Sequence, residues 1–154
     1  MLSVPLKLEA ALATYIAANY GTSGNEFNGV TISHGHTSAD VTAARRLDIY
    51  AGAPGGAHLR QGNYEVPVRF VLTTKAQLDV SETSAAVRLL HGERMEALLG
   101  IFAEGRVATV AAALAAIDAE LGVSSFWRES TADEFDEDSY TGELVLVFEA
   151  YIVA

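Results

Sequence analysis

The stretch QGNYEVPVRFVLTTKAQLDVSETSAAVRLLHGERMEALLGIFA, residues 61–103, joins a strand pattern directly to a helix pattern. Every second side chain from Tyr64 to Leu72 is apolar, which is the two-residue period of a half-buried β-strand. After the strand the apolar residues fall on one side of a helix, at positions Val87, Leu90, Leu98 and Ile101. We therefore expect a strand whose apolar face is covered by the helix that follows it.

Two more helices are predicted, one on either side of this stretch. The opening helix has one shared face, made of Leu8, Leu12, Tyr15, Ile16 and Asn19. Gly21 is placed to end it in a left-handed conformation. The later helix carries the stripe Val107, Val110, Leu114, Ile117 and Leu121, closed by Gly122. For the central helix, Asp79 and Glu82 have the spacing of a capping box.

Further strand patterns lie on both sides of the central stretch, at residues 30–33, 45–51, 123–128 and 140–153. The glycine-rich stretch 52–62 is typical of a loop. Pro67 lies inside the long strand and cannot donate a ladder hydrogen bond, which indicates an edge position or a bulge. Since an edge strand invites pairing with another subunit, Pro67 is a candidate interface residue.

This order of elements is a helix, two short strands, a long strand, two helices and a closing β-hairpin. Grouped strands and grouped helices of this kind predict an α+β fold. We expect a mainly antiparallel sheet of about five strands packed against two or three helices. The 154 residues suit one domain, 1–154, which buries roughly 70% of the surface of its unfolded chain.

Composition argues against several function classes. The chain has no cysteine, which removes disulfide frameworks, thiolate zinc sites and cysteine nucleophiles. A net charge of -10 argues against a surface that grips nucleic acid by its phosphates, though not against one that nucleic acid slides past. No segment reaches the eighteen or so apolar residues of a membrane span, so we expect no membrane association.

Chemical motifs are sparse, and we expect neither catalysis nor a cofactor. His34 and His36 stand two residues apart at a strand end and could hold one metal ion; solvent-exposed loop histidines are the other interpretation. A small metal-dependent hydrolase using this pair is the alternative function from the enzyme class. The glycines of 52–62 lack the following helix on which phosphate-binding loops depend.

One acidic cluster and two single residues have more than one interpretation. Six carboxylates lie between Glu129 and Asp138, at the expected tip of the closing hairpin. They can form a solvated loop, a partner contact, or a surface that repels DNA; an acidic module that mimics DNA is a further option. Arg94, on the apolar side of the long helix, either extends into water or pairs with a neighbouring subunit. Trp127 is either a core anchor or a ligand platform.

A family resemblance lies in the pattern and order of five segments: LEAALATYIAAN (8–19), NYEVPVRFVLTT (63–74), LLHGERMEALLGIF (89–102), LAAIDAELG (114–122) and GELVLVFEAYIVA (142–154). In these the chain resembles the tail terminator proteins of long-tailed bacteriophages and phage-tail-like particles. The resemblance implies an α+β fold and a structural virion protein without catalytic residues. It also implies a homo-oligomer, a hexameric ring that caps the tail tube and joins it to the neck or connector protein.

In that role double-stranded DNA passes through the ring without specific binding. The protein would lie in the tail or neck of the virion after assembly in the bacterial host cytoplasm. Another head-tail connector or a tail-tube subunit is the nearest alternative. The candidate subunit or partner interface residues are Arg45, Arg46, Gly55, Gly56, Arg60, Pro67, Arg94, Glu129, Asp133, Glu134, Asp136, Glu137, Asp138 and Tyr151.

Overall fold

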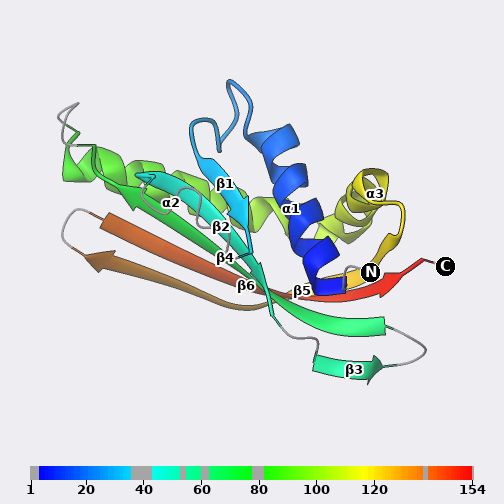
Figure 1. Ribbon diagram of the computed structural model, residues 1–154. Helices are drawn as coiled ribbons and strands as arrows, with labels where there is room; N and C mark the ends of the chain where they lie inside the picture. The colour runs from blue at the N-terminus through cyan, green and yellow to red at the C-terminus, as the bar shows by residue number, and fades with distance from the viewer. Residues whose placement is uncertain are drawn as a thin grey trace.

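The computed structural model describes residues 4–35, 43–52, 55–59, 63–77, 82–136 and 139–153, with 55–59 described as backbone. The elements follow in this order (Figure 1): α1 (Val4–Tyr20), β1 (Thr31–His34), β2 (Arg45–Ala51), β3 (Gly55–Leu59), β4 (Asn63–Lys75), α2 (Ser84–Ile101), η2 (Glu104–Arg106), α3 (Val107–Ile117), β5 (Leu121–Asp136) and β6 (Ser139–Ile152).

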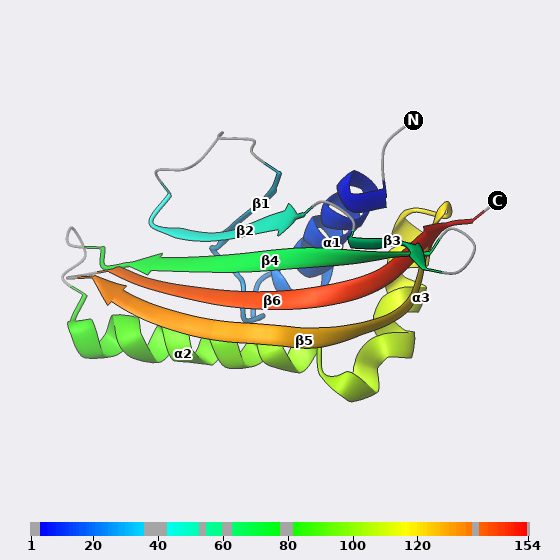
Figure 2. The same cartoon turned by 90° about the horizontal axis from the view of Figure 1, so that it is seen from below.

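The described strands form one sheet in the order β1-β2-β4-β6-β5, and β3 pairs with β4 beside that path. Strands β1 and β2 are parallel, and the other pairs are antiparallel. The helices pack on one face of this sheet (Figure 1). Seen from below, β4, β6 and β5 face the viewer with no described helix over them (Figure 2). The predicted α+β fold with a mainly antiparallel sheet is confirmed.

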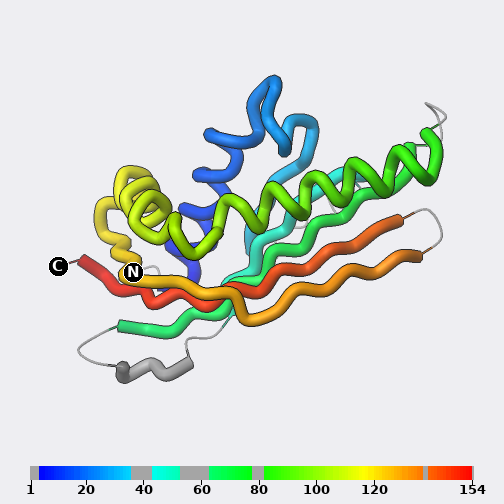
Figure 3. Tube along the Cα trace, turned by 180° about the vertical axis from the view of Figure 1, so that it is seen from behind, coloured from blue at the N-terminus to red at the C-terminus, as the bar shows by residue number. Residues whose placement is uncertain are grey.

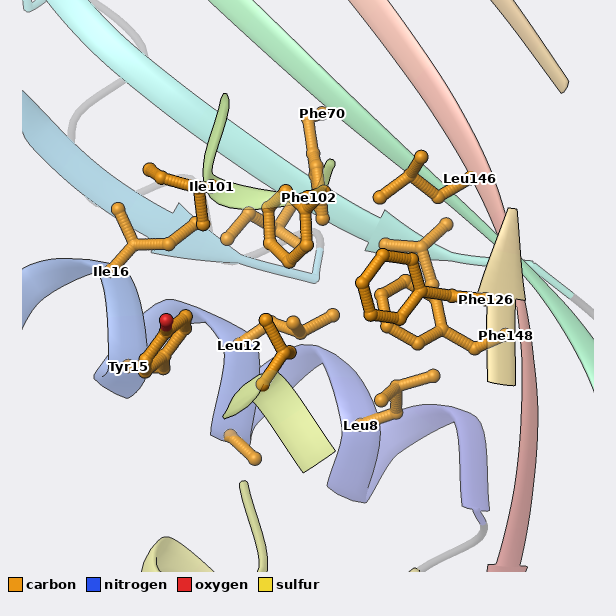
Figure 4. Packing of buried hydrophobic residues seen from close by; sticks show 14 of the residues in the cluster. Leu8, Leu12, Tyr15, Ile16, Phe70, Ile101, Phe102, Phe126, Leu146 and Phe148 are labelled. Carbon is orange, nitrogen blue, oxygen red and sulfur yellow. The ribbon is translucent and has the colours of Figure 1, made fainter. Parts of the chain in front are cut away.

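The core fills the space between the sheet and the helices. Leu8, Leu12 and Ile16 of α1 are fully buried and point toward the sheet (Figure 4). Against them lies an aromatic cluster in which Phe102, just after α2, stands 4.9 Å from Phe70 of β4 and 5.8 Å from Phe126 of β5, measured between ring centroids. Aromatic rings remove large apolar areas from water, so this cluster ties three elements together.

The central strand and helix form where the sequence predicts them, although Leu90, expected on the apolar face of the helix, is only partly buried. In β4 the residues Val66, Val68, Phe70 and Leu72 are fully buried, and in α2 Val87, Leu98 and Ile101 are buried. The N-terminal cap of α2 differs from the prediction. The hydroxyl of Thr83 accepts a hydrogen bond from the Ala86 N–H at 3.2 Å. Glu82 instead accepts hydrogen bonds from Arg45 and from the Gln77 N–H, and Asp79 lies outside the described residues.

The two flanking helices form with different ends from those predicted. Gly21 does not adopt a positive φ; a Cβ there would lie 2.8 Å from the Ala17 carbonyl oxygen, so the glycine allows close approach of backbone. Asn19 is exposed and donates to the Tyr15 carbonyl, so it does not join the buried face. Helix α3 ends at Ile117, because Leu121 and Gly122 already belong to β5.

Among the described helices none is by itself long and apolar enough to span a membrane. The pair Ser84–Ile101 and Glu104–Ile117 meets that test only when the two are joined across a bend of 54°.

Pro67 does not lie on an edge strand, because β4 is paired on both sides. Its carbonyl accepts a hydrogen bond from the Gly52 N–H at 2.7 Å, on the side where β2 has ended and β3 begins. N–H and C=O of one strand residue point the same way, so the missing donor of Pro67 falls at this junction. Residues 55–59, predicted as loop, form β3.

The closing hairpin is longer than predicted. Strand β5 continues from Leu121 to Asp136 and pairs with β6 over this length, with register shifts at Val123/Ser125 and Arg128/Ser130. Polar residues 129–136 were predicted as a loop because their apolar alternation is lost. Pairing with β6 supplies the backbone hydrogen bonds that keep this exposed segment extended.

We expect the burial of Leu98, on the core side of α2, to contribute strongly to stability. Leu98→Ala removes a fully buried side chain and should lower the free energy of unfolding by about 2 to 5 kcal/mol. The matched control on the same helix is Leu89→Ala, where the side chain is 65% exposed and the change should stay within about 0.5 kcal/mol. Urea titrations followed by circular dichroism measure both. Equal losses would contradict the packing described here.

Candidate functional site

The uncovered face of the sheet is the most extensive candidate interaction surface. Trp127 of β5 stands opposite Val147 of β6, which stands opposite Pro67 of β4, so these three side chains share that face. Val145 and Tyr151 of β6 lie on it by strand alternation. Trp127 is 40% exposed, so the interpretation as a core anchor is wrong. We refer below to these five residues as the open-face patch.

Two ion pairs lie on this face, while the carboxylates Glu65 and Glu149 stand opposite each other on it, between the Pro67–Val147–Trp127 row and Tyr151. Arg69 Nη2 lies 2.7 Å from Glu143 Oε2, across the β4–β6 pair. Arg46 Nε lies 3.1 Å from Asp48 Oδ2 on β2. Charges that are already paired lose less hydration energy when they are covered than isolated charges do. The candidate interface residue Arg46 is therefore part of an internal ion pair at the margin of the patch.

The Tyr151 ring packs over a glycine on the neighbouring strand β5. A Cβ on Gly122 would stand 2.3 Å from the Tyr151 ring, so only glycine leaves room for the ring at this position. Gly122 thus serves β-sheet packing instead of helix termination. The candidate interface residue Tyr151 keeps its place on the open face.

The second surface is the acidic end of the hairpin. The beginning of α2 lies at the same end of the molecule as the far ends of β5 and β6 (Figure 3), and Glu129, Glu134 and Asp136 of β5 are exposed. Glu137 and Asp138 lie outside the described residues. The expected acidic concentration therefore lies along a strand, where its spacing is fixed by the β ladder.

A polar cluster around the buried His91 connects this end of the hairpin to helix α2. His91 of α2 lies between the Thr74 hydroxyl, 3.0 Å from its Nδ1, and the Asp133 carboxylate, 2.8 Å from its Nε2. The His91 ring also stacks on Tyr140 at 5.5 Å. Gly142 leaves space for this arrangement, since a Cβ there would stand 2.9 Å from Asp133 Oδ1.

This cluster has the connectivity of a hydroxyl, imidazole and carboxylate relay but not its accessibility. Thr74 is fully buried, so its oxygen cannot reach a substrate in this conformation. The arrangement is a structural network in which each polar atom obtains a partner. The candidate interface residue Asp133 is engaged within the chain through this contact.

Arg94 is also engaged within the chain, so its interpretation as an outward-facing charge is wrong. It is 7% exposed, and its Nε and Nη2 donate to the carbonyls of Glu26 and Asn28 at 3.1 and 3.2 Å. Its Nη1 is buried without a hydrogen-bond partner. Burial, together with the neighbouring Arg45, lowers the pKa of Arg94 from its ordinary value. The side chain secures the connector between α1 and β1 on α2.

Arg45, at the beginning of β2, contacts the connection between β4 and α2. Its Nη2 donates to Glu82 Oε1, and its Nε donates to the Lys75 carbonyl at 3.2 Å. Glu82 also accepts the Gln77 N–H at 2.7 Å. The hydrogen bond from Arg45, and then that from Gln77, lower the pKa of Glu82 below its usual value. Arg45 therefore stabilises the β4-to-α2 connection.

Of the two histidines proposed as a metal-binding pair, His34 lies within the described residues. His34 Nδ1 lies 3.6 Å from Glu9 Oε1, and Glu9 Oε2 accepts the Ala51 N–H at 2.8 Å. His36 lies outside the described residues. Within the described ranges no group of three or more His, Cys, Asp or Glu residues is arranged to hold a metal ion.

The structure does not gather the predicted interface residues into one surface. Gly55 and Gly56 lie in β3, and Arg60 lies outside the described residues. Sequence reasoning missed the role of His91, because its partners Thr74 and Asp133 are 17 and 42 residues away. The valines of β6 were a usable signal for the open face, since alternating apolar residues on both sides of a strand indicate two partly covered faces.

No protein-family model matches the chain, and no curated protein matches it either.

The His91 contact generates a stability prediction. Asp133→Ala removes the carboxylate partner of His91 and should cost about 1 kcal/mol, since the side chain is partly solvated. The adjacent Glu134→Ala, on the opposite face of β5, should change stability by less than about 0.5 kcal/mol. Urea unfolding measures both, and hydrogen exchange at residues 139–142 should speed up only in Asp133→Ala. Equal effects would refute the fastening role.

The Glu82 contact generates a pH prediction. A carboxylate with a lowered folded-state pKa adds stability that is complete above its unfolded pKa and is lost as pH falls. Glu82→Gln should therefore be less stable than the parent at pH 7, and the difference should shrink between about pH 5 and 3. Unfolding titrations at each pH provide the measurement, with Glu96→Gln on exposed α2 surface as control. A difference that stays constant with pH would contradict the role of charge.

Proposed function

We propose that this protein is a non-enzymatic structural subunit of a phage tail or tail-like particle, a tail terminator that assembles into a ring. The observation that carries the proposal is the open-face patch, in which a 40% exposed tryptophan lies among apolar neighbours on an uncovered sheet. Exposed aromatic and aliphatic side chains on a face with a polar surround are typical of a surface that another protein covers. The family resemblance of the sequence gives the kind of assembly.

A ring requires that each subunit use two different surfaces. If the open-face patch of one copy meets the helical side of the next, the contact is heterologous and can close into a ring, six copies being the number implied by the resemblance. Two open faces meeting each other would instead give a closed dimer. The proposal therefore includes a head-to-tail contact.

The charge of the chain supports a place beside DNA. A net charge of -10 together with the exposed acidic end of β5 repels phosphates within roughly 10 Å, the screening length at moderate salt. Such a surface lets double-stranded DNA pass without specific binding. The proposed partners are accordingly the tail-tube protein and the neck or connector protein, and the proposed location is the tail or neck of a virion assembled in the host cytoplasm.

Native mass spectrometry and negative-stain electron microscopy of the pure protein test the proposal, alone and with the tail-tube protein of the same genome. We expect a closed ring, six copies by resemblance, that binds tube ends. Trp127→Glu should abolish the ring, because it places a charge within the proposed contact.

The matched control is Trp127→Phe, which keeps an apolar ring at the same position and should leave the assembly intact. Leu89→Glu adds the same charge at an exposed leucine on the helical side, which is the proposed complementary surface, and should weaken the assembly. A parent protein that stays monomeric at high concentration and never joins tube ends would refute the proposal.

A further inference from the structure

Strand β5 presents a long unpaired edge. In the described part of the chain its strand partner is β6, which leaves the other edge of Leu121–Asp136 without a strand. Backbone N–H and C=O groups along such an edge can pair with an additional strand. The two register shifts and the carboxylates of β5 are features that discourage uncontrolled pairing, so an added strand must fit this edge specifically.

A cleft of about 740 Å³ lies along the same edge, between β5 and the helices. Its walls include the apolar residues Leu99 of α2, Phe102, Val107 of α3 and Leu146 of β6. The polar residues Glu104, Ser125 and Arg128 also line it. The volume is in the range of small-ligand or peptide pockets. The cleft is thus a hollow with both apolar and polar walls, next to the unpaired backbone edge of β5.

These two features together define a recognition mode. A strand added to β5 would lie about 4.8 Å from it, with alternate side chains directed toward the helix layer. Apolar side chains two residues apart would then enter the cleft beside residues 125–128, while main-chain hydrogen bonds formed along the edge. The occupant is therefore an extended segment and not a helix.

The charge of β5 further restricts which segment can bind at this edge. Beyond the cleft, residues 129–136 carry Glu129, Asp133, Glu134 and Asp136 and no basic residue. A second copy of β5 placed antiparallel on this edge would bring like charges together, which is destabilising. A segment with Lys or Arg at these positions would instead be attracted.

We infer that the β5 edge and its cleft bind an extended segment of a partner protein by strand addition, with apolar residues in the cleft and basic residues beside 129–136. The inference does not depend on ring formation, because it uses the sheet edge and the inner cleft and not the open face. Trp127 belongs to both surfaces: its side chain lies in the open-face patch, and its backbone lies in the β5 edge.

A synthetic peptide tests the inference directly. The probe is a fluorescein-labelled decapeptide, alternating Lys and Thr in its first half and Val and Thr in its second, which matches β5 in antiparallel orientation. We expect saturable binding in fluorescence anisotropy and shifts of amide signals from residues 125–136 in NMR spectra. A version with proline at two central positions should bind at least about tenfold more weakly, because it cannot complete the ladder.

Variants of the protein separate the cleft from the charge. Glu134→Lys with Asp136→Lys should weaken binding about fivefold at low salt and reduce its salt dependence. The matched control, Glu93→Lys with Glu96→Lys, changes the net charge equally on exposed α2 surface and should change binding by less than about twofold. Ala103→Trp, which fills the cleft, should weaken binding about tenfold.

Two results would overturn the inference: equal binding of the proline peptide, or equal loss in both double-charge variants. The second would mean that the peptide senses only net charge. Size-exclusion chromatography of the same samples reports ring formation separately, so failure of peptide binding and failure of ring assembly are distinguishable.

Discussion

The pairing of β4 with β6 decides where every other element can lie, because these strands form the middle of the sheet and are paired from Tyr64↔Ala150 to Lys75↔Ser139. Each ladder position fixes which side chains face the helices. Phe70 and Leu144 stand opposite each other on the inner face, while Arg69 and Val145 stand opposite each other on the outer one. A slip of one residue would exchange the two faces, so the core and the open face depend on the same register.

The helical layer is positioned by polar contacts as well as by apolar packing. His91 connects α2 to the far end of β5, and Arg94 connects it to the carbonyls after α1. Both side chains are almost fully buried, and groups of this kind are tolerated where hydrogen bonds replace water. One long helix thus orients both the connector after α1 and the acidic hairpin end relative to the sheet.

This arrangement separates three surfaces with different physical character. The open face carries apolar side chains together with ion pairs, the hairpin end is acidic, and the β5 edge combines unpaired backbone groups with a cleft of mixed polarity. Surfaces that differ in this way favour contacts with different partners over self-pairing of one patch. The proposed ring subunit, which would contact a neighbour, a tube end and passing DNA, would need such a division.

Local pattern was sufficient for much of the fold. The two-residue period of β4, the helical spacing of α2 and the alternation of β6 each depend on neighbours within one element, so the α+β class and most element positions could be predicted. The sequence also determined the negative charge. Two segments that the local pattern predicts as loops, residues 129–136 and Gly55–Leu59, form strands. They do so because β6 and β4 provide partners for them.

The sites depended on contacts between residues far apart in the chain. Neither the buried position of Arg94 nor the outward position of Trp127 follows from its own neighbours; the first needs the carbonyls of residue 26 and 28, the second the register with Val147. Amino-acid sequence by itself determined which segments become helix or strand and how acidic the molecule is. Tertiary structure alone decided which edge stays unpaired, which face stays uncovered and which charges are neutralised, because these depend on pairing and burial across the whole sheet.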